Sequence, residues 1–333
     1  MKQRNKFWIL IMFLLLIILA FVIYSIAKQE QVSPGSVLHN PSIEKPSNQM
    51  QNISVYFCGV DNCSMILESQ ISNSKKADCA FYELTRKNIV SALDNASARV
   101  VIDRDERKKE NNKSYVKTAK NSALMHNKFC VLDNVISLTG SFNPTLNDGD
   151  ENNVVIFDSG EIASHYQVEF NELWEHQNNQ PSAKNQFGNV EIYFCPEDNC
   201  ADQVILELKS AKSSINFMIF SFTHTQIGTE IVLKYHEGIK IAGLMEKSQS
   251  SNFSRYSLFK EQGMNVSWDG SKDLLHHKVF IIDNETVITG SFNPSNNADK
   301  RNDENLVIIH DNQIASKFQL EFERLFAESL KAN

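Results

Sequence analysis

Basic residues are not in excess in this chain of 333 residues, where 33 lysines and arginines stand against 40 aspartates and glutamates. Four of the basic residues and none of the acidic ones lie within residues 1–28, so the remainder has 29 against 40, a formal charge of −11. This balance is not typical of a protein that coats nucleic acid nonspecifically, although a local basic pocket is compatible with it. The hydrophobic content of 42% is sufficient for sizeable cores.

Charged residues are also absent from residues 7–27, where Ile, Leu and Phe dominate. The run is about as long as the 20 residues that a membrane-spanning helix needs. Three basic residues precede it and one follows it closely, which favours a cytoplasmic N-terminus. We therefore expect residues 1–28 to form a cytoplasmic tip and a single transmembrane helix, with the rest of the chain outside the cytoplasm.

A cleaved signal peptide is the alternative interpretation, because Ser25-Ile26-Ala27 resembles a small-x-small cleavage site. The uncharged run is longer than the apolar core of an ordinary signal peptide, which favours the anchor. Residues 29–52 contain few large apolar side chains and many Ser, Pro, Asn and Gln residues. That composition predicts a flexible stalk between the membrane and a folded part.

Beyond the stalk the sequence repeats itself. The matching segments are Ile53-Ser-Val-Tyr-Phe-Cys58 with Val190-Glu-Ile-Tyr-Phe-Cys195, His126-Asn-Lys128 with His276-His-Lys278, Gly140-Ser-Phe-Asn143-Pro144 with Gly290-Ser-Phe-Asn293-Pro294, and Glu151-Asn152 with Glu304-Asn305. We infer a tandem duplication, with halves at residues 53–177 and 190–330 that are joined by a polar linker at 178–189.

Each half is expected to have an α/β fold. Strands are predicted where β-branched and aromatic residues cluster, and an amphipathic helix closes each half. The predicted strands are residues 53–57, 99–103, 128–132, 135–139 and 153–157 in the first half, and 190–194, 215–222, 239–245, 278–282, 286–289 and 306–309 in the second. The predicted helices are residues 161–176 and 312–330.

Two histidine–lysine pairs carry the candidate chemistry. His126 and Lys128 are two residues apart on a predicted strand, so their side chains leave the same face and can share a ligand. Asp133 has an odd spacing from both and is expected to be a support. Ser141 and Asn143, again two apart, can present a hydroxyl and an amide to that ligand. The second half repeats the arrangement with His276, Lys278, Asp283, Ser291 and Asn293.

This H-x-K-x4-D-x6-G-S-x-N pattern resembles the HKD motif of the phospholipase D superfamily, and the compact halves are most similar to its small bacterial nuclease branch. The resemblance covers roughly residues 53–330, and it is specific because six positions recur in one register. It implies a duplicated phospholipase D-like fold, in which two mixed β-sheets flanked by helices pack about a pseudo-twofold axis. Both motifs would then form one active site within a single chain, so no oligomer is required.

The resemblance implies a phosphodiesterase that needs neither a metal nor a cofactor, because lysines and asparagines can neutralise the phosphate oxygens. One histidine must be neutral to attack phosphorus, and the other must be protonated to supply the leaving alkoxide. The resemblance assigns attack to His126 and proton donation to His276. Glu151 and Glu304 resemble the family's downstream carboxylate, which orients the histidine ring, although they lie 25 and 28 residues after their histidines.

Four cysteines form two matching pairs. The pairs are Cys58 with Cys63 and Cys195 with Cys200. They are compatible with a disulfide in each half, a shared four-thiolate zinc site or buried free thiols. A domain outside the cytoplasm favours disulfides.

Three further residues have no counterpart of their own type in the other half. Cys79 and Cys130 align with Asn216 and Phe280, so we predict that both are core residues. His277 replaces an asparagine of the first motif, and neighbouring strand positions face opposite ways, so we expect it to be structural or solvent-exposed.

Three reactions fit such a site: hydrolysis of a phospholipid headgroup, hydrolysis of DNA or RNA, and phosphatidyl transfer as in cardiolipin synthases. The expected anchor and the acidic charge favour a phospholipid. The compact halves, by their likeness to the nuclease branch, favour an extracytoplasmic nuclease. A short chain with one anchor makes a synthase the third choice. A noncatalytic binding module is a further alternative, against which both intact motifs argue.

Overall fold

The computed structural model describes residues 52–109, 111–120, 122–147, 149–177 and 180–332, which belong to one compact unit. The transmembrane helix expected within residues 1–28 and nearly all of the expected stalk lie outside the described residues, so both stay predictions. In the described part, no helix combines the length and the apolar character that a membrane span requires.

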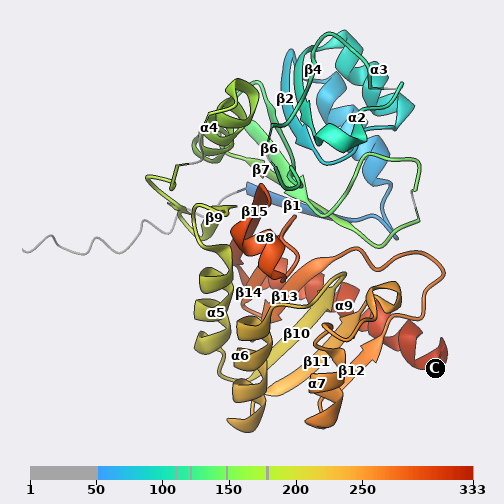
Figure 1. Ribbon diagram of the computed structural model, residues 1–333, viewed down its shortest axis with the longest axis vertical. Coiled ribbons are helices and arrows are strands. Elements are labelled where there is room, and N and C mark those ends of the chain that lie inside the picture. Colours follow the sequence, from blue (N-terminus) through green and yellow to red (C-terminus); the bar gives the residue numbers. More distant parts are fainter. Residues whose placement is uncertain (1–51, 110, 121, 148, 178–179, 333) are drawn as a thin grey trace, which may run out of the picture. The chain divides into compact units, whose positions relative to one another are not determined.

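A seven-stranded mixed sheet forms the first half (Figure 1). Its strands are β1 (Asn52–Phe57), β2 (Lys76–Phe81), β3 (Ser97–Ile102), β4 (Val116–Thr118), β5 (Lys128–Leu132), β6 (Ile136–Gly140) and β7 (Asn153–Asp158). Their order is β1-β7-β6-β5-β2-β3-β4, and the pairs β2–β3 and β3–β4 are parallel while the others are antiparallel.

The second half repeats this topology in an eight-stranded sheet. Its strands are β8 (Gln186–Phe187), β9 (Val190–Cys195), β10 (Ser214–Ile219), β11 (Lys240–Met245), β12 (Asn265–Trp268), β13 (Lys278–Ile282), β14 (Thr286–Gly290) and β15 (Glu304–His310). The order β12-β11-β10-β13-β14-β15-β9-β8 is that of the first sheet read backwards, with β8 added from the predicted linker. Both halves therefore have an α/β fold with a mixed sheet, as the sequence predicts.

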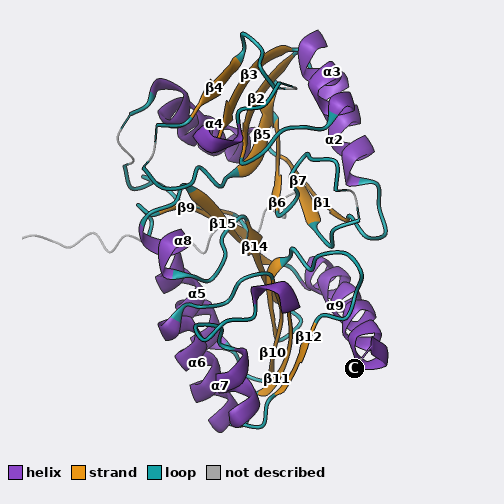
Figure 2. Ribbon diagram, turned by 45° about the vertical axis from the view of Figure 1, so that its right-hand side comes forward, coloured by secondary structure: helices purple, strands orange, loops and turns teal. Residues whose placement is uncertain are grey.

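Helices cover both faces of each sheet (Figure 2). They are α2 (Cys63–Ser72), α3 (Lys87–Asn95) and α4 (Gly160–Glu175) in the first half, and α5 (Cys200–Ser210), α6 (Thr225–His236), α7 (Tyr256–Glu261), α8 (Asn296–Lys300) and α9 (Asn312–Ala332) in the second. The helix α7 has no counterpart among the described residues of the first half, which accounts for part of that half's shorter sequence before its histidine.

One hydrophobic core joins the two halves. The α4 side chain Tyr166 packs edge-on against Phe194 of β9, with ring centroids 5.4 Å apart. In the reverse direction, Phe318 of α9 packs edge-on against Phe57 of β1 at 5.1 Å. Tyr166 and Phe318 occupy matching positions in the two halves, and so do Phe57 and Phe194. This reciprocal packing is what a pseudo-twofold relation between the halves produces. The site between the halves is thus held by a continuous apolar core.

The central strand β2 was missed by the sequence prediction. Its segment Lys-Ala-Asp-Cys-Ala-Phe contains residue types that are uncommon in strands. Tertiary contacts compensate, because the buried Asp78 carboxylate accepts two hydrogen bonds from Arg99 and forms an ion pair with Lys76 at 2.8 Å. These cations hold the pKa of Asp78 below its usual value despite burial.

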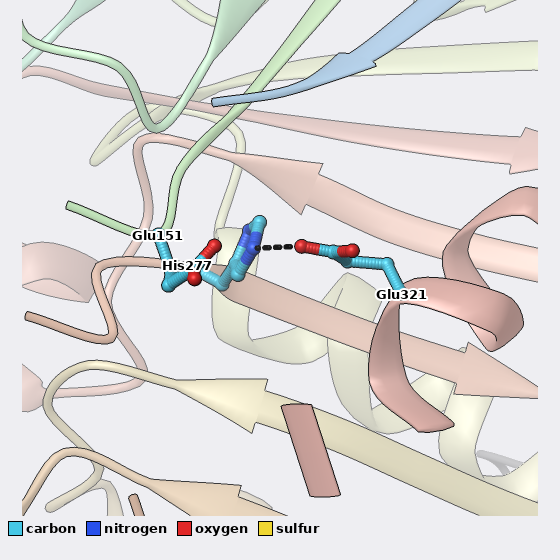
Figure 3. Close-up of side chains that lie close together, drawn as sticks. All are labelled: Glu151, His277 and Glu321. Carbon is cyan, nitrogen blue, oxygen red and sulfur yellow. Dashed lines mark ion pairs between the residues drawn. The ribbon is translucent and has the colours of Figure 1, made fainter. Parts of the chain in front are cut away.

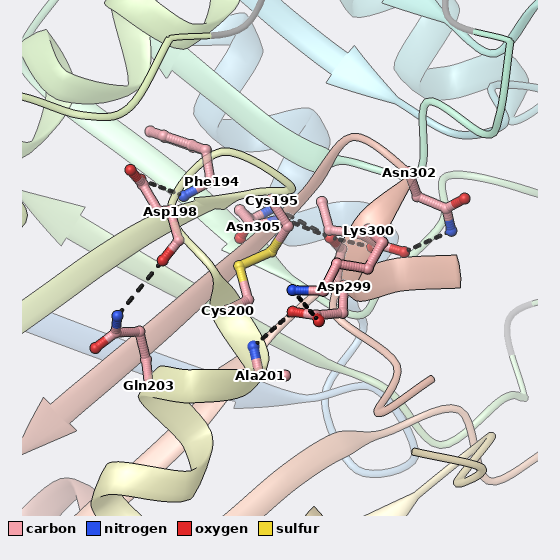
Figure 4. The surroundings of a disulfide bond; sticks show 12 residues. Phe194, Cys195, Asp198, Cys200, Ala201, Gln203, Asp299, Lys300, Asn302 and Asn305 are labelled. Atoms are coloured by element: carbon pink, nitrogen blue, oxygen red, sulfur yellow. Dashed lines mark hydrogen bonds and ion pairs between the residues drawn. A yellow bond between two sulfur atoms is a disulfide. The ribbon is translucent and has the colours of Figure 1, made fainter. Parts of the chain in front are cut away.

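Each matching cysteine pair forms a disulfide at the start of a helix. Cys58 is bonded to Cys63, and Cys195 is bonded to Cys200. Figure 4 shows the second bond beside Asp299, whose carboxylate accepts the Ala201 backbone N–H at 2.9 Å. Neither a four-thiolate site nor free thiols are present among the described cysteines.

Cys79 and Cys130 confirm the prediction of core residues and correct the alignment of the repeat. Both are buried core residues, but they also form a third disulfide, between opposed positions of β2 and β5. The alignment with Asn216 was displaced by one position, since the residue of β10 that occupies the place of Cys79 is Phe217. In the second half this cross-strand position holds an aromatic pair, Phe217 and Phe280, with ring centroids 6.1 Å apart.

Candidate active site

The two histidines meet at the junction of the halves because each is held by the other half. The backbone N–H of His126 donates to the carbonyl of Asp303 at 2.9 Å, and that of His276 donates to the carbonyl of Glu151 at 2.9 Å. Each histidine stands two residues before a buried lysine at the start of β5 or β13. The spacing of the motif therefore brings both imidazole–lysine pairs into one place.

His126 is paired with a carboxylate from the opposite half. Its Nδ1 lies 2.7 Å from Oε2 of Glu304, a fully buried side chain. Hydrogen bonds from Ser291 (2.7 Å) and Asn302 (3.1 Å) hold that carboxylate. Burial raises the pKa of Glu304, but His126, Lys128 and the Ser291 hydroxyl together keep it below its usual value. Because an ionised carboxylate can only accept, Nδ1 carries the proton and Nε2 keeps a free lone pair.

Beside Nδ1 of His276, the described part of the chain places no carboxylate. That nitrogen lies 2.8 Å from the amide oxygen Oδ1 of Asn152 and 3.1 Å from the carbonyl of Ser141. Both partners are neutral acceptors, so Nδ1 again carries the proton, but no negative charge stabilises an imidazolium. The two histidines thus share a tautomer and differ in their electrostatic surroundings.

Glu151 does not orient a histidine, contrary to the prediction. Strand registers pair Gly140 with Val154 and Gly290 with Leu306, so Asn152 occupies the place of Glu304. The two Glu-Asn dipeptides that match in the sequence are therefore displaced by one residue in space. The carboxylate of Glu151 instead forms an ion pair with Arg324 at 2.8 Å.

His277 is fully buried and structural rather than exposed. Figure 3 shows its ring between the side chains of Glu151 and Glu321. Its Nδ1 lies 3.1 Å from the amide nitrogen of Asn153, and its Nε2 lies 3.7 Å from the carboxylate of Glu321. Glu321, His277 and Glu151 are grouped closely enough to hold a metal ion. The guanidinium of Arg324 already contacts both carboxylates, at 2.7 and 2.8 Å, so an internal cation balances this cluster.

The two lysines supply positive charge in a buried place. Lys128 and Lys278 are each only 2% exposed, and each Nζ donates to the carbonyl of its own motif histidine at 2.7 Å. Burial lowers the pKa of Lys128 to about 7 and that of Lys278 well below its usual value, the latter also because Lys128 is close by. An anion placed between the lysines would stabilise their charged forms and offset the cost of burying them. This is how a phosphate-binding site behaves.

Burial lowers the pKa of both histidines. Glu304 partly counteracts the effect at His126. Nothing comparable acts on His276, whose pKa lies well below its usual value because of burial and of the charges on Lys278 and Lys128. Because Glu304 faces His126 and Asn152 faces His276, the two histidines also differ in their affinity for a proton.

The motif serines have a structural position. Ser141 and Ser291 are fully buried, and their hydroxyls accept the backbone N–H groups of Asn153 (3.0 Å) and Asn305 (2.9 Å). The two-residue spacing predicted that these serines present a hydroxyl to a ligand. That prediction is wrong, because both hydroxyls are buried against the backbone. The preceding glycines have φ of +141° and +126°, and a side chain at either would collide with the carbonyl oxygen of the facing asparagine.

Asn143 and Asn293 remain available to a ligand. Both are half-buried, and their amide oxygens have no hydrogen-bond partner among the described residues. The motif aspartates lie elsewhere, since Asp133 accepts backbone N–H groups of residues 75 and 76 and Asp283 those of residues 212–214. They support the chain before β2 and β10, so they have the supporting position that the odd spacing predicts.

Two aromatic residues that the sequence did not indicate also contact the histidines. The Tyr82 ring packs edge-on against His126 at 5.1 Å, and the Phe220 ring against His276 at 4.8 Å. Nζ of Lys128 lies 5.3 Å from the Tyr82 ring, and Nζ of Lys278 lies 5.0 Å from that of Phe220. Tyr82 directly follows β2, which the sequence analysis did not predict, and Phe220 directly follows β10.

Known proteins resemble part of this chain in sequence. A phospholipase D of Rickettsia typhi (strain ATCC VR-144 / Wilmington) is 33% identical over 131 residues, which are 39% of this chain and 64% of that protein. A mitochondrial cardiolipin hydrolase of Mus musculus is 29% identical over 132 residues, 39% of this chain and 60% of that protein. The chain thus spans less than two thirds of the length of these curated relatives.

The fold and the family are shared over both halves. The crystal structure of phosphatidylserine synthase from Haemophilus influenzae Rd KW20 matches 83% of this chain and 86% of its own, with a TM-score of 0.62 and 13% identity, which shows a common fold. A family model described as cardiolipin synthase, PLD-like domain, matches residues 67–174 and 204–326. The chain therefore belongs to the phospholipase D superfamily.

Proposed function

We propose that the protein is a phospholipase D-type phosphodiesterase that hydrolyses phosphodiester bonds through a phosphohistidine intermediate. The observation that carries this proposal is the convergence of two buried imidazole–lysine pairs with one ionised carboxylate, Glu304, on His126. The lysines, with Asn143 and Asn293, supply the charge and hydrogen bonds that a phosphate group needs.

In the first step, Nε2 of His126 attacks phosphorus, a P–N bond forms and the P–O bond to the leaving alcohol breaks. Glu304 stabilises the positive charge that the imidazole ring acquires. His276 donates its Nε2 proton to the leaving oxygen. In the second step, His276 removes a proton from water, whose oxygen attacks phosphorus and releases His126.

We propose a phospholipid as the substrate and a location outside the cytoplasm. The substrate is supported by the negative charge of the chain and by relatives named phospholipase D and cardiolipin hydrolase. The location is supported by the uncharged run at residues 7–27 and by three disulfides, which persist in oxidising compartments.

An assay of the full-length chain with EDTA tests this proposal. Bis-p-nitrophenyl phosphate, mixed phospholipids and single-stranded DNA are offered side by side, with and without the chelator. We expect turnover of the first two in both conditions, since side chains rather than a metal neutralise the phosphate. Loss on chelation with recovery on Zn²⁺ or Mg²⁺ would overturn the metal-free mechanism. Faster cleavage of DNA than of lipid would establish the nuclease alternative, and no turnover of any substrate would support a binding module.

The pH dependence follows from the lowered pKa values. His126 must be neutral, so activity is lost as pH falls below its pKa, and His276 must be protonated, so activity is lost as pH rises above its pKa. Both pKa values lie below the usual 6.5, and Lys128 loses its charge above about 7. We expect kcat/KM for phospholipid to follow a bell-shaped curve with its maximum on the acidic side of pH 6.5. A maximum at alkaline pH would contradict the assignment.

A further inference from the structure

A polar cavity of about 460 Å³ opens beside the second motif. It lies between the loops that follow β10 and β11. The residues that carry the argument are Ser221, Thr223, Ser248, Ser250, Arg255 and Asn296. The volume is within the range of roughly 300–1,000 Å³ that small-molecule sites occupy.

The strand registers place the loops that line this cavity at the sheet edge where His276 lies. Ile219, at the end of β10, pairs with Lys278 on one side and with Met245 on the other, so both loops leave the sheet at the edge that carries the motif. Ser221 directly follows Phe220, whose ring contacts His276 at 4.8 Å.

The buried carboxylate of Glu246 links the cavity wall to the motif through two hydrogen bonds. Glu246 accepts the backbone N–H of Ser248 at 2.7 Å with one oxygen, and that of Leu275 at 2.9 Å with the other. Leu275 immediately precedes His276. A molecule in the cavity would therefore lie against a wall whose position is coupled to that of the imidazole.

The lining favours a neutral alcohol with several hydroxyl groups. Ser221, Thr223, Ser248 and Ser250 have side-chain hydroxyls with no hydrogen-bond partner in the described part of the chain, and each can both donate and accept. Arg255 is the one charged side chain among the described residues that line the cavity. Among the described lining residues a cationic headgroup would meet no carboxylate and a single aromatic ring, that of Phe253, rather than the carboxylate or aromatic cage that usually binds it.

The equivalent corner of the first half is built differently. Lys108 there forms ion pairs with Glu83 at 2.6 Å and with Glu106 at 2.9 Å. The Tyr82 hydroxyl donates to Glu106 at 3.3 Å. These charged groups pair with one another. The hydroxyl-lined cavity therefore distinguishes the His276 side of the site from the His126 side.

From this asymmetry we propose that the cavity binds the leaving alcohol, and that this alcohol is the glycerol headgroup of a phospholipid. The inference rests on the proposed function, in which His276 protonates the leaving oxygen. The acid and the alcohol must lie on the same side of phosphorus, and the cavity lies on the His276 side. Hydroxyl groups of the headgroup would exchange hydrogen bonds with Thr223 and Ser248.

The test compares substrates and a matched pair of variants in the full-length chain. Thr223→Val combined with Ser248→Ala removes two cavity hydroxyls. Thr85→Val is the control, since Thr85 and Thr223 occupy equivalent places, each donating its backbone N–H to the proline of its motif, at 3.0 and 2.9 Å. Phosphatidylglycerol, phosphatidylcholine and single-stranded DNA are presented separately, the lipids in mixed micelles, and bis-p-nitrophenyl phosphate reports on the chemistry alone.

We expect the native chain to cleave phosphatidylglycerol about tenfold or more faster than phosphatidylcholine. The double variant should lose roughly 10- to 100-fold in kcat/KM for phosphatidylglycerol, the size of two hydrogen bonds, and little for the other substrates. Thr85→Val should change neither. Equal rates on both lipids, an equal loss on both, or preferred cleavage of DNA would overturn the inference while bis-p-nitrophenyl phosphate is still cleaved. No cleavage of that compound would instead refute the proposed function.

Discussion

His126→Ala is expected to lower turnover of every phosphodiester at least ~10⁴-fold, because it removes the proposed nucleophile, without which the proposed intermediate does not form. His276→Ala should give a different result. With a phospholipid, whose alkoxide needs a proton to leave, it should lower turnover roughly 10²- to 10⁴-fold. With bis-p-nitrophenyl phosphate, whose leaving group needs no proton, the first step should proceed and only the second should stall.

The measurement is a rapid-quench experiment with a labelled substrate. His276→Ala should release p-nitrophenol in a burst and accumulate label on the peptide that carries His126. Quenching must avoid acid, which hydrolyses the phosphorus–nitrogen bond. Unchanged thermal unfolding of both variants controls for misfolding. Label on the peptide that carries His276 in the native protein would reverse the two roles, and normal turnover without any label would indicate direct attack by water.

Glu304→Gln is expected to lower kcat roughly 10²- to 10⁴-fold, because an amide cannot stabilise the positive charge of the imidazole during attack. The substitution keeps the shape of the side chain. Glu304 also accepts hydrogen bonds from Ser291 and Asn302, so the unfolding temperature must be measured alongside kcat. A loss of less than tenfold in a folded variant would show that Glu304 is not needed for attack.

Asn152→Asp is the matched change at the equivalent position in the other half. A carboxylate beside Nδ1 of His276 would favour its imidazolium and raise its pKa. We therefore expect the alkaline limb of the pH profile to move upward, with a smaller effect on kcat than that of Glu304→Gln. An unmoved limb would contradict the role of His276 as the acid.

Much of the site could be predicted from the sequence because its signals are local and repeated. The two-residue spacing between His126 and Lys128 requires that both side chains share a face, and the second copy makes an accidental match untenable. The two cysteines of each matching pair are only five positions apart, so the bonded partners lie close together in the sequence. The β-branched strands and the closing helices have clear periodicities, whereas β2 resembles no strand in isolation.

The tertiary structure alone decided which residue faces which histidine. Glu304 reaches His126 across the two halves, 178 positions away in the sequence, and nothing in a repeat alignment indicates an exchange between the copies. A displacement of one residue also separates Glu151 from the position of Glu304, because strand register is set by ladder hydrogen bonds rather than by matching letters. Strand register likewise places Cys79 opposite Cys130. The sequence by itself determined the family and the residue types of the candidate site. The packing of the halves determined the asymmetry between the two histidines, since burial and neighbouring charge are properties of the folded chain.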